Sequence, residues 1–137
     1  MPIHKSTPYS LGKLMPIRFL ILLYFVNKNK EKPVFVFFWD SECKDARMEL
    51  EKVKQWTEKN KNKATIIGVN LDYDISNYQN YIKQNKLKFK NYHCNEGSLS
   101  QISNLFWTSQ TPYGIAIKNG ILAQKDINFE DFLNSMK

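Results

Sequence analysis

The two cysteines are the side chains with the clearest potential for chemistry in this sequence. Cys43 follows an apolar run that ends at Trp39, and Cys94 directly follows His93. A cysteine thiolate can attack a disulfide or bind a metal ion. Two cysteines in 137 residues are too few for a scaffold held together by disulfides, so each cysteine is a candidate reactive thiol in its own right.

Cys43 lies where a strand is expected to give way to a helix. A helix N-terminus favours the thiolate form of a cysteine. Its charged neighbours act in both directions, since two are basic and three are acidic: Lys44, Arg47, Asp40, Glu42 and Asp45. Two interpretations stay open, a reactive thiol and a small residue retained at a strand–helix junction.

Cys94 is a candidate second thiol. Both cysteines are expected near the carboxyl ends of parallel strands, yet a disulfide needs Cα atoms within about 7 Å. Strand ends that are not adjacent exceed this distance unless their loops bend inward. The residues His4, Cys43, His93 and Cys94 do not have the spacing of a common zinc site, so no metal and no cofactor are expected.

Alternating apolar and polar segments predict the elements that position these residues. Strands are expected at 34–38, 65–71, 89–94, 114–117 and 121–125, with helices after 43, over 76–85, from 98 and after 128. The predicted helix caps are Asp40 or Ser41, Ser76, Ser98 and Asn128. Asn119-Gly120 predicts a two-residue hairpin. This order indicates an α/β domain with a mostly parallel central sheet and an antiparallel C-terminal hairpin.

Four short motifs in this order resemble the thioredoxin superfamily, and most closely its TlpA/ResA-like (AhpC/TSA-related) branch. They are Phe38-Trp39-x-x-x-Cys43, Ile67-Gly68-Val69-Asn70-Leu71-Asp72, Thr111-Pro112 and Lys118-Asn119-Gly120-Ile121. The likeness runs from about Pro33 to the C-terminus. It implies a thioredoxin-like three-layer sandwich with a TlpA-type αβ insertion.

The resemblance also assigns expected roles to residues of the site. Cys43 would be the attacking thiol, but Ala46 stands where the family has its resolving cysteine, so the site reads as a degenerate CxxA. Thr111-Pro112 would be the segment with a cis-proline. Trp39, Thr111 and Pro112 would contact a substrate or partner, which in the family adds as an extended strand. Efficient dithiol oxidoreductase activity is therefore not expected.

Residues 1–30 differ in composition from the rest of the chain. They carry five basic groups and no acidic group, and they contain the apolar run 19–26. This run is too short to span a bilayer, which needs about 20 residues. It fits a buried strand, a targeting segment or an anchoring segment. We therefore expect an N-terminal arm or first strand over 1–30 and a thioredoxin-like domain over 31–137.

The net charge of +7 does not indicate a nucleic-acid partner. The arm holds most of the charge, and only two of the 20 basic residues are arginine, the side chain best suited to phosphates and base edges. Expected partners are other protein subunits or a disulfide-bearing protein, with membrane contact through the arm left open. An organelle such as the mitochondrion, or the cell envelope, is favoured over the free cytosol.

Two functions remain in view from the sequence. The first is a non-catalytic thioredoxin-fold subunit or adaptor of a larger assembly. The second is a single-cysteine thiol-disulfide exchange protein that works through Cys43. The missing resolving cysteine, the acidic neighbours of Cys43 and the basic arm favour the first.

Overall fold

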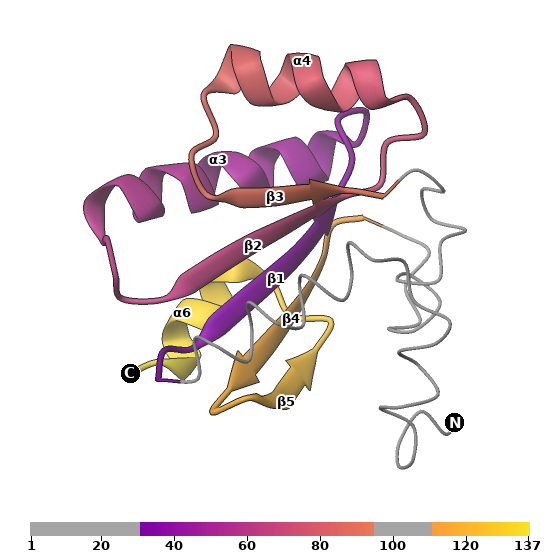
Figure 1. Cartoon of the computed structure of the whole chain (residues 1–137). Coiled ribbons are helices and arrows are strands. Elements are labelled where there is room, and N and C mark those ends of the chain that lie inside the picture. Colours follow the sequence, from indigo (N-terminus) through magenta and orange to yellow (C-terminus); the bar gives the residue numbers. More distant parts are fainter. Residues whose placement is uncertain (1–30, 95–110) are drawn as a thin grey trace, which may run out of the picture.

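The computed structural model describes residues 31–94 and 111–137. They form a five-stranded sheet in the order β3-β2-β1-β4-β5 with three helices. The strands are β1 (Val34–Trp39), β2 (Thr65–Asn70), β3 (Lys90–His93), β4 (Tyr113–Lys118) and β5 (Ile121–Lys125). The helices are α3 (Lys44–Lys59), α4 (Ile75–Asn85) and α6 (Phe129–Ser135) (Figure 1).

The sheet is mostly parallel on one side of β1 and antiparallel on the other. β1 pairs in parallel with β2, and β2 pairs in parallel with β3. β4 pairs antiparallel with β1, and β5 antiparallel with β4. The turn Asn119-Gly120 has positive φ at both residues, as a two-residue hairpin requires. The predicted mixed α/β architecture and C-terminal hairpin are confirmed.

β1 is buried along its whole length because both of its faces are covered. Phe35, Phe37 and Trp39 point to one face, which packs against the three described helices. Val34, Val36 and Phe38 point to the other face, where they join residues of β2 and β4. A central strand buried on both faces has no need of alternating polar residues, which explains its continuous apolar run.

The three described helices use aromatic and aliphatic side chains to cover one face of the sheet. α3 buries Ala46, Leu50 and Val53 against it, and α6 adds Phe129 and Phe132. α4 packs more loosely, through three half-buried side chains, Tyr78, Tyr81 and Ile82. In residues 31–94 and 111–137, no helix is both long enough and apolar enough to cross a membrane.

Two predicted helix caps are wrong by two or three residues. α3 begins at Lys44 with Cys43 in the N-cap position, whereas Asp40 or Ser41 was expected there. α4 is capped by Asp74, whose carboxylate accepts from the Ser76 backbone N–H. Asn128 caps α6 as predicted. The apolar run 19–26 and the helix predicted from Ser98 lie outside the described residues.

Candidate functional site

Cys43 lies against the segment that leads into β4. Its thiol Sγ donates to the backbone oxygen of Thr111 at 3.3 Å, and the Thr111–Pro112 peptide bond is cis. Cys43 follows the carboxyl end of β1. Because β4 starts at Tyr113 and runs antiparallel to β1, the segment before β4 lies at the same end of the strands as Cys43 (Figure 1). Cys43 is half-buried, so part of the residue is accessible to solvent.

Asp40 links these two segments at this end of the sheet. Its Oδ1 accepts from the backbone N–H of Cys43 at 2.9 Å and of Glu42 at 3.0 Å. Its Oδ2 accepts from the Thr111 hydroxyl at 2.6 Å. One carboxylate thus binds the backbone of Cys43 and the side chain of Thr111, and Thr111 is also the residue whose carbonyl accepts from the Cys43 thiol.

A second carboxylate fixes the same loop from the other side. Asp72 is buried, and its Oδ1 accepts from the backbone N–H of Ser41 at 2.9 Å and from the Ser41 hydroxyl at 3.1 Å. Its Oδ2 accepts from the Asn70 side chain at 2.9 Å. Arg47 donates to the Ser41 carbonyl at 3.0 Å. The loop between β1 and α3 is therefore anchored to the end of β2 and to the first turns of α3.

The first turn of α3 begins directly after Cys43. Cys43 occupies the N-cap position, and among the described residues no side chain makes a capping hydrogen bond there. The first N–H groups of a helix have no partner within the helix, and they favour a negative charge at this position. A thiolate at Cys43 would meet that requirement. Asp40 and Asp45 place negative charge nearby, while Lys44 is exposed beside them.

The position three residues after Cys43 carries no thiol. Ala46 is fully buried and packs with the side chains between α3 and the sheet. The two cysteines are both free, and they join different core clusters, Cys43 on the helix-covered face and Cys94 on the other. The sheet therefore separates Cys94 from Cys43.

Trp39 lies in the core. Its side chain is fully buried, Nε1 donates to Asn91 Oδ1 at 3.0 Å, and the ring packs against Tyr81. Trp39 therefore has no exposed surface to offer to a partner, in contrast to the role that the resemblance implied. In the described parts of the chain, no group of three or more potential metal-ligating residues occurs.

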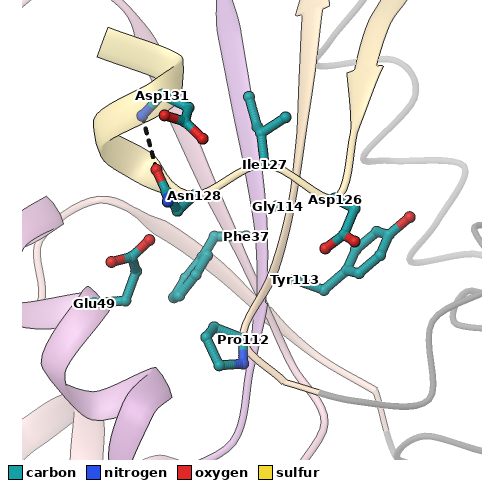
Figure 2. Close-up of a pocket in the computed structure, with 9 residues that line it drawn as sticks. All are labelled: Phe37, Glu49, Pro112, Tyr113, Gly114, Asp126, Ile127, Asn128 and Asp131. Atoms are coloured by element: carbon teal, nitrogen blue, oxygen red, sulfur yellow. Dashed lines mark hydrogen bonds between the residues drawn. The ribbon is translucent and has the colours of Figure 1, made fainter. Parts of the chain in front are cut away.

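Glu49 is a polar residue of this region that the sequence reading missed. It is largely buried on the core side of α3, and its Oε2 accepts from the Phe129 backbone N–H at 2.8 Å. It also lines a cavity of about 180 Å³, where Figure 2 shows Glu49, Phe37 and Pro112 around one space. Glu49 follows Cys43 by almost two helical turns, and only its place in the apolar stripe of α3 could have drawn attention to it.

The same cavity is lined on its far side by the strand ends and the start of α6. Tyr113, Asp126 and Asp131 contribute to it (Figure 2). Partial burial raises the pKa of the Tyr113 hydroxyl above its ordinary value, and the negative charge of Asp126 adds to this effect. Tyr113 is therefore a neutral phenol at physiological pH.

Comparison with known proteins gives a family match and a fold match. The family model described as thioredoxin-like matches residues 20–120. No curated protein matches the chain.

Among solved structures, the C-terminal domain of a protein assigned as a thiol-disulfide oxidoreductase from Bacteroides thetaiotaomicron is 20% identical, with a TM-score of 0.69 over 78% of this chain and 76% of that one. The thioredoxin domain of a Bacteroides vulgatus thiol-disulfide oxidoreductase is 21% identical, with a TM-score of 0.68 over 80% of each chain. StoA from Bacillus subtilis is 19% identical, with a TM-score of 0.64 over 80% of this chain and 85% of that one. The predicted thioredoxin-like fold is confirmed, and it is the fold type of thiol-disulfide oxidoreductases.

Proposed function

Because this chain belongs to the thioredoxin-like family, we propose that it is a single-cysteine thiol-disulfide exchange protein. In this proposal it binds an extended segment of a disulfide-bearing protein at Thr111-Pro112 and reacts through Cys43. The observation that carries the proposal is the 3.3 Å contact between Cys43 Sγ and the Thr111 backbone oxygen, at an uncapped helix start.

The proposed reaction has two balanced steps. The Cys43 thiolate attacks one sulfur of the partner disulfide, so that a mixed disulfide forms and the other partner sulfur leaves as a thiolate. The thiolate of a small external thiol then attacks the partner's sulfur in the mixed disulfide. Cys43 leaves as a thiolate, and the partner now carries a disulfide to the small thiol. Since Ala46 carries no sulfur and Cys94 belongs to the core cluster on the other face of the sheet, we expect the second thiol to come from outside the chain.

Turnover of a peptide disulfide tests this proposal. The full chain with Cys94→Ser is mixed with an excess of a small thiol and a peptide disulfide, and the released peptide thiol is measured against time. We expect release above the uncatalysed rate, and we expect it to vanish in the additional Cys43→Ser variant. Insulin reduction should stay near the uncatalysed rate, because that assay favours a dithiol. Release at the same rate with and without Cys43 would rule the proposal out.

A second candidate function, a non-catalytic adaptor subunit, is favoured by a different observation. β5 is the last strand on its side of the described sheet, and Ile121 and Leu122 on it are 68% and 44% exposed. Exposed apolar residues on an edge strand are a common site of protein–protein association. An adaptor would remain in a stable large complex in native extracts after Cys43→Ser, whereas a covalent exchange protein would lose its disulfide-linked partners.

The compartment is part of the same proposal. Thiol-disulfide exchange with protein disulfides needs a setting in which such disulfides persist, such as the cell envelope or an oxidising organellar space. We propose such a compartment for this chain, and fractionation of cells that express the full chain with a small C-terminal tag tests it.

A further inference from the structure

We propose that Asp40 is the positioning residue of the Cys43 thiol: by binding the Cys43 backbone and the Thr111 hydroxyl with one carboxylate, it sets the distance between the thiol and the partner-binding segment. This inference rests on the proposed exchange function. It assigns a role to a residue that neither reacts nor belongs to the cysteine motif.

The connectivity of the site supports this role. Asp40 Oδ1 accepts from Cys43 N, and Asp40 Oδ2 accepts from Thr111 Oγ1, so these bonds and the contact from Cys43 Sγ to Thr111 O close a ring of interactions. Two members of the ring, Asp40 and Cys43, belong to one segment, and the third, Thr111, belongs to another that is far away in the chain. Hydrogen bonds to a carboxylate are short and strong, and the 2.6 Å bond to the hydroxyl is of this kind.

The alternatives for holding these two segments together are few. Asp72 anchors Ser41 to the end of β2, so it fixes the loop but does not reach the Thr111 segment through any of its hydrogen bonds. The pairing of Phe38 with Tyr113 ends the ladder between β1 and β4 before Thr111 is reached. Beyond the end of the strand pairing, the described hydrogen bonds between the two segments come from the Asp40 carboxylate and from the Cys43 thiol itself.

The same carboxylate also brings a negative charge close to the thiol. The other charged or titratable groups on the elements around Cys43 are Glu42, Lys44, Asp45, Arg47, Asp72 and Tyr113. Replacement of Asp40 by asparagine removes this charge but keeps only one of the two acceptor oxygens, so the link is tested with Asp40→Ala and Thr111→Val instead.

Two reactions of Cys43 provide the test, both in the full chain with Cys94→Ser. Iodoacetamide needs only an accessible thiol, whereas a peptide disulfide also has to align along Thr111. We expect Thr111→Val to slow mixed-disulfide formation about tenfold, the size expected from loss of one hydrogen bond to a charged group, while the alkylation rate changes less than twofold. Thr111→Ser, which keeps the hydroxyl, should recover most of the lost rate.

A double-mutant cycle gives the coupling. If Asp40 acts through Thr111, Asp40→Ala combined with Thr111→Val should be no slower than the slower single variant, because either change breaks the same link. Additive losses, or folded single variants that react with the peptide disulfide at the unchanged rate, would overturn the positioning role. Circular dichroism and thermal unfolding establish that each variant is folded.

Thermal unfolding of the same variants separates failure of this inference from failure of the proposed function. Asp40→Ala and Thr111→Val should each lower the Tm, and the double variant should lose less than the sum of the two, because either change breaks the same hydrogen bond. Glu58→Gln, which removes an exposed charge near the other end of α3, should leave the Tm close to that of the parent. If the parent protein forms no mixed disulfide, the exchange function fails. Asp40 is then judged by thermal unfolding alone, and losses in Tm that add in the double variant would overturn its role.

Discussion

Cys43 and Ala46 together define the chemistry that this chain can perform. Cys43 is half-buried at the start of α3 with its thiol on the Thr111 carbonyl, and Ala46 is fully buried one helical turn later. A dithiol enzyme resolves its own mixed disulfide with the second cysteine. In this chain the resolving step has no internal thiol, so a mixed disulfide at Cys43 should persist until an external thiol arrives.

Restoring the second cysteine is the first prediction at this scale. In Ala46→Cys, with Cys94→Ser, we expect a disulfide between residues 43 and 46 after mild oxidation and insulin reduction clearly above the level of the Cys43-only protein. The added sulfur enters a packed core, so we also expect a loss of about 1–3 kcal/mol in unfolding free energy.

Non-reducing mass mapping, insulin turbidity and urea unfolding measure the three effects. A matched Ala46→Ser variant shows the effect of the added atom without a thiol. Absence of the new disulfide in the folded protein would contradict the view that only the second sulfur is missing from this site.

The N-caps of the helices are where the structure differs from the prediction made from the sequence. The strand–helix order was predictable because β1, β2 and the Asn119-Gly120 turn carry strong local signals. The caps were harder, because several polar residues stand in a row before each helix and all of them favour N-cap positions. Which one caps depends on where the preceding strand ends. Asp40 is instead used to bind Thr111, and Asp74 caps α4.

The cap of α4 carries a prediction on pH. The backbone N–H and the hydroxyl of Ser76 both donate to Asp74 and lower the pKa of its carboxyl below the ordinary value of 3.8. A carboxyl whose pKa is lower in the folded than in the unfolded state stabilises the fold above the unfolded pKa, and this effect is lost as the pH falls through the folded pKa. Asp74→Ala should therefore lower the Tm at neutral pH, by an amount that shrinks below pH 3.8.

Asn128 provides the control for this experiment. It caps α6 by accepting from the Asp131 backbone N–H at 2.7 Å, and its amide does not titrate. Asn128→Ala should cost about 1 kcal/mol at every pH at which the protein is folded. A destabilisation by Asp74→Ala that stays constant down to the lowest such pH would contradict the assigned role of the Asp74 charge.

Contact between helices gives the second prediction at the scale of elements. Glu49 on α3 accepts from the first backbone N–H of α6, so it joins two helices that lie side by side on the sheet. Glu49→Ala leaves that buried N–H without its acceptor and should lower the unfolding free energy by about 1–3 kcal/mol. Glu49→Gln keeps an acceptor oxygen and should cost less.

Urea unfolding of the two variants measures this difference. Equal and small effects of Glu49→Ala and Glu49→Gln would mean that the hydrogen bond between α3 and α6 contributes little. Sequence periodicity could not reveal this bond, because a glutamate in an apolar stripe says nothing about the distant backbone that it meets.

For the whole molecule, the predictable part was the layered α/β fold and the less predictable part was the set of long-range contacts. Alternating strands and helices imply a parallel sheet whatever the details of packing. The ring of Asp40, Cys43 and Thr111 depends on side-chain directions at a loop, which no local pattern encodes. Trp39 illustrates the same limit, since an aromatic residue next to a predicted site turned out to be a core residue.

The central sheet lies between the two core clusters that contain the cysteines. Cys43 and Cys94 belong to clusters on opposite faces, so a bridge between them would require the chain to rearrange around the end of β2. A single accessible thiol in a scaffold that holds it beside a partner-binding segment is consistent with covalent capture followed by release to an external thiol. The central claim is therefore that Cys43 by itself captures a disulfide.

The most direct test is the intact mass of the folded full chain with Cys94→Ser after exposure to a peptide disulfide at neutral pH. The account predicts one peptide per chain, attached at Cys43, stable after removal of excess peptide and released by a small thiol. The same treatment of Cys43→Ser should leave the mass unchanged. A folded parent protein that acquires no peptide, although its thiol is labelled by iodoacetamide, would contradict the exchange function and favour the adaptor.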